Sequence, residues 1–166
     1  MISVIIFMNQ YENRYSKIVN ELIMKSFPEL KNFKIILFES NAKRFEKHSA
    51  DIFYGFFFAV IRVSKKVRKF PRKALVGLFA HELSHFTIFH NRRPFQKFLA
   101  GFNYLTSKKH HKKEERDTDR FAIKRGYWKE LYFTRVKKKE VYGFSLDDNY
   151  LNPKEIKSYV KKIRKW

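Results

Sequence analysis

The sequence contains no cysteine, and only five glycines and four prolines among its 166 residues. A chain without cysteine forms no disulfide, no thiolate metal site and no cysteine nucleophile. Any metal site must therefore use histidine and carboxylate ligands. The length fits one domain with one hydrophobic core, and the sequence shows no repeat, linker or second-domain boundary, so we expect residues 1–166 to form a single domain.

Long apolar runs are also missing. The longest, residues 2–8 and 52–61, are much shorter than the roughly 20 residues that a membrane-spanning helix needs. No small-residue cleavage site follows the first run, so the N-terminus does not indicate a signal peptide. We therefore expect a soluble, cytoplasmic protein.

Acidic residues are scarce, with 16 Asp and Glu against 37 Lys and Arg, which gives a formal net charge of +21. A charge of this size attracts polyanions, so nucleic acid and an anionic membrane surface are candidate partners, as is an acidic protein. The basic residues are spread along the chain, which equally suits the charged surface of a thermophilic protein. The charge alone leaves the partner and the oligomeric state open.

The hydropathy pattern predicts an α+β fold. Residues 1–50 are predicted to form a strand–helix–strand part, with strands over 2–8 and 33–38 and a helix over 11–27. Residues 52–63 are predicted as a third strand, bent at Gly55. Helices are then expected over 71–90, 95–105 and 109–125, from Trp128, and from Pro153. We expect a small twisted sheet packed against the helix at 71–90 and the helix at 109–125.

The pentapeptide HELSH, residues 81–85, lies in the first of these two helices. His81 and His85 are four residues apart, so both rings project from one helical face and can bind one metal ion. Glu82 then lies beside the ion without binding it. Zinc lowers the pKa of a bound water to about 7, and a neighbouring carboxylate can take the proton as that water attacks a carbonyl.

A catalytic zinc ion usually has three protein ligands, and HELSH supplies two. The pattern HExxHxxGxxH would place a third histidine at position 91, which is Asn91 here. The later segment EERDTDRFA offers carboxylates instead, at Glu114, Glu115, Asp117 and Asp119.

HELSH followed by EERDTDRFAIKRGY resembles the gluzincin metallopeptidases, whose pattern is HExxH and then ExxxD. It is similar to the catalytic core of the CAAX-prenyl-protease and heat-shock membrane proteases, and most similar to the minigluzincins, small soluble archaeal versions of that core. The resemblance covers about residues 52–133 and implies a zinc endopeptidase with Glu115 as the third ligand. It implies that Asp119 orients a ligand histidine. Thr118 departs from the pattern, which usually has alanine there.

The spacing of Glu115 and Asp119 agrees with this assignment, since residues four apart share one helical face. Two related classes stay open. Proteases that cut repressors also combine HExxH with a later glutamate, but usually have asparagine at the position of Asp119. DNA-repair metalloproteases use a third histidine, which His110 or His111 could supply.

A non-catalytic, nucleic-acid-binding protein with a structural zinc ion is the alternative from another class. Glu82 argues against it, because a structural site has no use for that carboxylate and normally has four protein ligands.

Two segments outside the motif carry further expectations. Tyr127 could donate a hydrogen bond to an oxyanion, although simple packing is the more common role. Minigluzincins resemble zymogens in which a terminal segment blocks the cleft, so Asp147 or Asp148 in the tail at 142–166 could bind the zinc ion. The alternative for the tail is a terminal helix docked on the core. An edge of the sheet near residues 56–58 could bind a peptide as an added strand.

Overall fold

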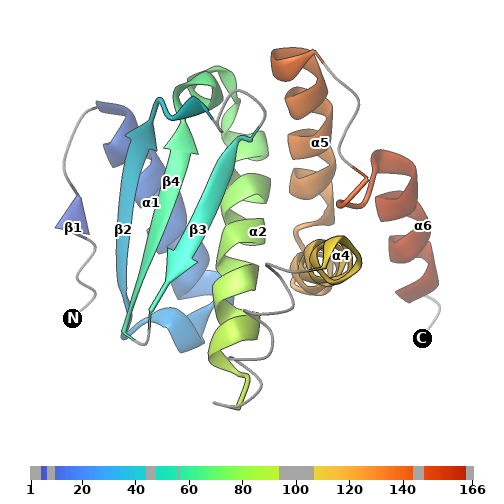
Figure 1. The fold of residues 1–166 in the computed structure, drawn as a ribbon, viewed down its shortest axis with the longest axis horizontal. Coiled ribbons are helices and arrows are strands. Elements are labelled where there is room, and N and C mark those ends of the chain that lie inside the picture. The colour runs from blue at the N-terminus through green and yellow to red at the C-terminus, as the bar shows by residue number, and fades with distance from the viewer. Residues whose placement is uncertain are drawn as a thin grey trace.

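A computed structural model describes residues 5–6, 10–43, 48–55, 57–93, 107–143 and 148–163 of this chain. These form an α+β fold, as predicted (Figure 1). The elements are, in order, β1 (Ile5–Ile6), α1 (Gln10–Ser26), the 3-10 helix η1 (Pro28–Leu30), β2 (Lys34–Ser40), β3 (Ala50–Tyr54), β4 (Phe58–Ser64), the 3-10 helix η3 (Lys65–Lys69), α2 (Arg72–His90), α4 (Lys108–Lys124), α5 (Trp128–Tyr142) and α6 (Pro153–Ile163).

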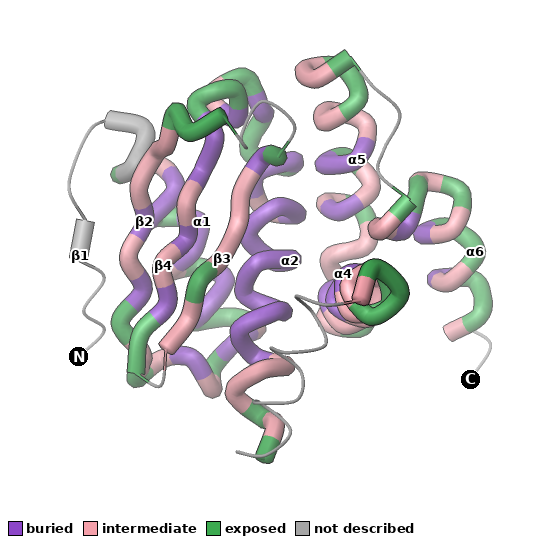
Figure 2. Tube along the Cα trace, viewed as in Figure 1, coloured by how far each residue is buried: buried purple, intermediate pink, exposed green. Residues whose placement is uncertain are grey.

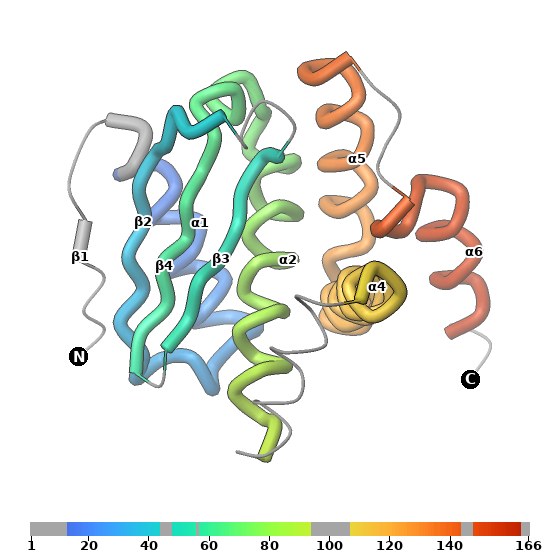
Figure 3. Tube along the Cα trace, in the orientation of Figure 1, coloured from blue at the N-terminus to red at the C-terminus, as the bar shows by residue number. Residues whose placement is uncertain are grey.

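The sheet is mixed, with the strand order β1-β2-β4-β3. β2 and β4 run parallel, β3 is antiparallel to β4 at one edge, and the short β1 pairs with β2. In β4 the alternate residues Ala59, Ile61 and Val63 are buried, and they face the layer formed by α1 and α2 (Figure 1). Figure 3 follows the chain from this sheet to the helices α4, α5 and α6 on the other side of α2.

The prediction of one bent strand over 52–63 is wrong. These residues belong to two antiparallel strands, β3 and β4, and the Gly55 N–H donates to the carbonyl of Phe58 at their turn. The sequence does not reveal the turn, because the residue at the turn, Phe57, is apolar although it is 83% exposed. A polar residue there would have marked the break between the strands.

The other elements lie close to their predicted positions. α1, β2, α2 and α4 each begin and end within a few residues of the expected bounds, and α5 and α6 begin at the predicted Trp128 and Pro153. Of the predicted strand at 2–8, the structure describes Ile5 and Ile6, and the helix predicted at 95–105 lies outside the described residues. None of the helices within the described ranges is long and apolar enough to cross a membrane.

A second, smaller cluster of buried residues joins the last helices. It consists of Ile123, Leu131, Leu151, Ile156 and Val160, from α4, α5, the segment before α6, and α6. The described part of the C-terminal tail is therefore docked on the domain through an apolar contact, which was the alternative expectation for this tail.

The central part of helix α2 lies inside the domain. Every residue from Gly77 to Thr87 is buried, and Figure 2 shows this stretch as buried along its length. The sheet and α1 cover one side, and α4 and α5 cover the other, so the helix predicted at 109–125 packs against α2 and not, as expected, against the sheet. A helix in this position normally carries apolar residues all round. The polar residues of HELSH therefore lie inside the domain rather than on its surface.

The crossing of α2 and α5 depends on Gly77. A Cβ atom at this position would overlap the backbone carbonyl of Glu130 and the Oγ1 atom of Thr134. The Thr134 hydroxyl also donates to the carbonyl of Ala74, at 2.7 Å, which ties α5 to the first turn of α2.

We predict that Gly77→Ala destabilises the protein by about 1–3 kcal/mol, because α5 must move away from α2 to admit the methyl group. In a helix with free space the same change would stabilise by up to about 1 kcal/mol, since alanine has the higher helix propensity. Urea unfolding measures the effect, and an increase in stability would contradict the close packing of the two helices.

Candidate metal centre

Helix α2 brings three ionisable side chains into the interior. His81, Glu82 and His85 are 4%, 5% and 9% exposed, respectively. Such groups are costly to bury unless they find polar partners. Helix α4, which packs against α2, supplies the carboxylates of Glu115 and Asp119.

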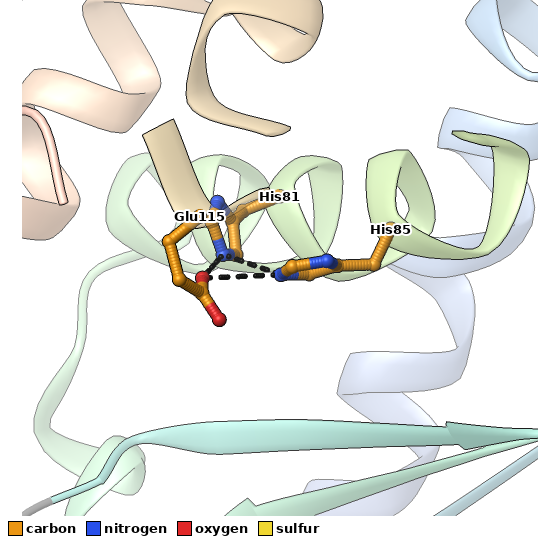
Figure 4. A group of neighbouring side chains, drawn as sticks. All are labelled: His81, His85 and Glu115. Atoms are coloured by element: carbon orange, nitrogen blue, oxygen red, sulfur yellow. Dashed lines mark hydrogen bonds and ion pairs between the residues drawn. The ribbon is translucent and has the colours of Figure 1, made fainter. Parts of the chain in front are cut away.

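Three ligand atoms converge between α2 and α4 (Figure 4). Glu115 Oε2 lies 3.1 Å from His81 Nε2 and 3.2 Å from His85 Nε2, and the two Nε2 atoms are 3.2 Å apart. Among the described residues, His81, His85 and Glu115 form the group of ligand atoms that all lie within 4.8 Å of one another. This buried group could hold a metal ion.

Asp119 is a fully buried carboxylate with three partners. Its Oδ1 atom lies 2.8 Å from His81 Nδ1 and accepts from Arg135 Nη2 at 2.5 Å, and its Oδ2 atom accepts from the Leu151 N–H at 2.8 Å. Burial by itself would raise the pKa of Asp119, but the charge of Arg135 and the hydrogen bond with His81 outweigh it and lower the pKa to about 2. Asp119 is therefore ionised at neutral pH.

The ionisation of Asp119 determines which ring nitrogen of His81 carries a hydrogen. An ionised carboxylate only accepts hydrogen bonds, so His81 Nδ1 must carry a hydrogen to approach it at 2.8 Å. In a neutral His81 ring, Nε2 then presents its lone pair to Glu115 Oε2. Two acceptors repel at this distance unless a proton or a metal ion lies between them.

The surrounding side chains favour a positive charge between His81 Nε2 and Glu115 Oε2. Burial alone lowers the pKa of His81, but hydrogen bonds with Asp119 and Glu115 outweigh it and raise the pKa to about 9. Burial alone would likewise raise the pKa of Glu115, but the charge of His85 and hydrogen bonds from the surrounding histidines hold it well below its usual value. A proton and a metal ion compete for the same lone pairs.

The donor atoms suit a zinc ion. A tetrahedral ion with ligand distances of about 2.0–2.2 Å separates its ligand atoms by about 3.3–3.6 Å. The three separations of 3.1–3.2 Å are within a few tenths of an ångström of this range. Magnesium and calcium prefer oxygen ligands, whereas two imidazoles and one carboxylate suit zinc and the neighbouring transition metals.

Thr118 contacts the second histidine, His85, and this contact was not predicted from the sequence. Its Oγ1 atom lies 3.2 Å from His85 Nδ1, so the threonine can fix the orientation of that ring from α4 as Asp119 fixes His81. Thr118 is three residues after Glu115, so the two share one face of α4, and this spacing could have predicted that Thr118 lies near the histidines.

Arg135 was also missed. It lies on α5, 16 residues after Asp119, and is 1% exposed. Nothing in the local sequence distinguishes this arginine from the many other basic residues of the chain, because its role depends on the packing of α5 against α4.

Glu82 lies one residue after His81 in the same buried helix. Burial raises its pKa, while the charges of His81 and His85 lower it, and the net effect is a raised pKa. A carboxyl group of raised pKa is suited to accepting and then returning a proton near neutral pH.

The other acidic residues of α4 point elsewhere. Glu114 pairs with Arg92 at 2.8 Å, and Asp117 pairs with Arg120 at 2.6 Å. Of the four carboxylates that the sequence offered, the structure brings Glu115 and Asp119 to the histidines.

The two histidines at the start of α4 differ in position. His110 is exposed and lies against the capping Ser107, whereas His111 Nε2 lies 3.2 Å from the second oxygen of Glu115, Oε1. Neither histidine belongs to the group of converging ligand atoms found among the described residues.

The structure does not bring Tyr127 to the polar cluster formed by His81, His85, Glu115 and Asp119. Its hydroxyl donates to Ser26 Oγ at 2.7 Å, and its ring stacks on Phe27 with the ring centroids 6.3 Å apart. Its contacts are those of a residue that packs α1 against the start of α5.

The structure describes one of the two acidic residues predicted in the tail, Asp148, and its contact is with Lys112. Asp147 lies outside the described residues, and the side chain of Asp148 is 96% exposed, with Oδ2 4.0 Å from Lys112 Nζ. Tyr150 approaches instead, with its ring 5.6 Å from the His81 ring and 4.5 Å from the Arg135 guanidinium, measured between centres.

Comparison with known proteins adds no relative: no protein-family model, no curated protein and no solved structure matches this chain.

We predict that the metal-free protein loses stability as the pH rises from 6.5 to 9. The pKa of His81 is raised to about 9 in the folded protein from 6.5 in the unfolded chain. Its contribution is therefore fully present below pH 6.5 and is lost as the pH rises toward 9. Urea unfolding of chelator-treated protein at the two ends of this range should show a decrease of a few kcal/mol.

The matched variant is His81→Gln, which cannot take up the proton. Other groups titrate in both proteins, so the difference between them isolates His81. An equal pH dependence in the two proteins would show that His81 does not hold a proton in the metal-free state.

Proposed function

We propose that this chain is a zinc-dependent endopeptidase. The observation that carries the proposal is the position of Glu82, a buried carboxylate on the same helix as the two histidines of a three-ligand group. Three protein ligands leave a coordination position for water, which is the arrangement of a hydrolytic zinc site. A structural site would have no use for Glu82.

In the proposed reaction His81, His85 and Glu115 hold the zinc ion. Bound zinc would polarise the substrate carbonyl and lower the pKa of a water molecule to about 7. Glu82 takes the proton of the attacking water and passes it to the leaving amine. Asp119 keeps the hydrogen of His81 on Nδ1, so that Nε2 stays directed at the ion.

The edge strand β3 supports peptide binding beside the cluster. β3 packs against α2 and pairs on one side with β4. An extended peptide could pair with its other edge, as an added strand, and run along the helix that carries the cluster. Phe53 on this strand is 59% exposed and would provide an apolar contact for a substrate side chain.

The net charge of +21 supports a second candidate, a nucleic-acid-associated protein. This could be a protease that acts on DNA-bound substrates or a non-catalytic binding protein. Binding of DNA that weakens steeply with salt would favour this candidate. Loss of peptidase activity in Glu82→Gln would then separate the protease from the binding protein.

We predict that the purified chain contains one zinc ion, measured by elemental analysis. Glu82→Gln should keep the ion and lose peptide hydrolysis by at least about 100-fold, because it removes the proton acceptor and leaves the ligands intact. Glu115→Ala should lose the ion and the activity together. Cleavage of casein gives the activity.

Glu114→Ala is the matched control, since its carboxylate pairs with Arg92 and lies next to Glu115 in the chain. It should keep both zinc and activity. A folded wild-type protein that neither contains nor takes up a metal ion would disprove the proposal, as would a Glu82→Gln variant with full activity.

We further propose that the C-terminal segment makes the enzyme latent. The segment at 148–152 reaches the cluster through Tyr150, beside the His81 ring, and through the Leu151 N–H on Asp119. Deletion of residues 145–166 is a poor test, because Leu151, Ile156 and Val160 are buried and the deletion would expose apolar surface. A point substitution is sharper.

We predict that Tyr150→Ala raises the initial rate of casein cleavage several-fold while leaving the zinc content unchanged. Removing the ring opens space beside His81 and leaves Leu151 and α6 in place. Tyr159→Ala, on α6 and away from His81, is the control and should leave the rate unchanged. An unchanged or lower rate in Tyr150→Ala would show that this segment does not restrict the site.

A further inference from the structure

The two oxygens of Glu115 have different partners. Oε2 faces the Nε2 atoms of His81 and His85, whereas Oε1 lies 3.2 Å from His111 Nε2. His111 and Glu115 are four residues apart on α4, so both project from the same helical face. The second oxygen thus points away from the converging ligand atoms and toward the start of α4.

His111 lies at the margin of the cluster. Its side chain is 33% exposed, whereas that of Glu115 is 5% exposed. Among the described residues it does not belong to the group of converging ligand atoms, but it contacts Glu115, which does. Because His111 is partly exposed, its side chain can be replaced without opening a cavity in the core.

The hydrogen bond needs no particular charge on His111. Glu115 is ionised, so its Oε1 atom only accepts, and His111 Nε2 must carry the hydrogen. The neutral ring with its hydrogen on Nε2 meets this condition, as does the protonated ring.

A donor on Oε1 affects how Glu115 can bind an ion. A carboxylate with both oxygens available can bind through one or through both, and the second mode fills an additional coordination position. A hydrogen bond to Oε1 favours binding through Oε2 alone and fixes the rotation of the carboxylate. The remaining position then stays available to water, as a hydrolytic site requires.

We propose that His111 is a positioning residue that holds Glu115 as a ligand through one oxygen. The inference rests on the proposed function in that it needs a metal ion between α2 and α4. It assigns to His111 a role different from that of a third histidine ligand.

The test compares three variants. His111→Leu removes the donor, His111→Gln keeps an N–H donor that can reach Oε1, and His110→Leu changes the neighbouring histidine, which lies against Ser107. Zinc affinity is measured by competition with a chelator. The cobalt-substituted proteins are compared by visible absorption, because four-coordinate cobalt absorbs more strongly than five-coordinate cobalt. Circular dichroism confirms that each variant is folded.

We expect His111→Leu to bind zinc about 10–100-fold more weakly than the wild type. Its cobalt form should absorb more weakly if Glu115 then binds through both oxygens. His111→Gln should stay within a few-fold of the wild type, and His110→Leu should be unchanged. Unchanged affinity and absorption in His111→Leu would overturn the inference, as would equal losses in the leucine variants at 110 and 111.

Failure of the proposed function gives a different result. If the wild type binds zinc but cleaves no peptide, the peptidase proposal fails, while the affinities of the His111 variants still decide the inference. If the wild type binds no metal ion, both fail together.

Discussion

The ionised carboxylate of Asp119 is the group on which the arrangement around the cluster depends. It is fully buried, and a buried charge is tolerated only when it is paired and hydrogen-bonded. Its partners come from three other parts of the chain: His81 on α2, Arg135 on α5 and the backbone of Leu151 before α6. One carboxylate on α4 thereby links α2, α5 and the segment that precedes α6.

The burial of α2 strengthens the electrostatic interactions among the side chains that could hold a metal ion. Its imidazoles and Glu82 are shielded from water, so charges near them interact more strongly than they would at the surface. The same burial lowers the stability of the folded protein when no proton or metal ion lies between the ligand atoms of His81, His85 and Glu115. Stability and the capacity to bind a cation are therefore properties of the same few side chains.

The sequence was sufficient for what depends on local spacing. The i and i+4 positions of His81 and His85, and of Glu115 and Asp119, predicted which residues share a face, and the structure brings these two faces together. Arg135 could not be predicted, because its contact with Asp119 arises from the packing of two helices. The hairpin at 50–64 was missed because phenylalanine occupies its turn, and the contacts of Tyr127 depend on α1, about 100 residues earlier in the chain.

The hydrogen bond from Leu151 to Asp119 has a consequence for the C-terminal segment. Asp119 accepts from this backbone N–H and also contacts the ring nitrogen of His81, so the segment and the cation site share one carboxylate. Such sharing makes the two equilibria thermodynamically linked, and linkage is reciprocal. If an ion binds between α2 and α4, any change that the docked segment makes to the free energy of ion binding equals the change that the ion makes to the docking of the segment.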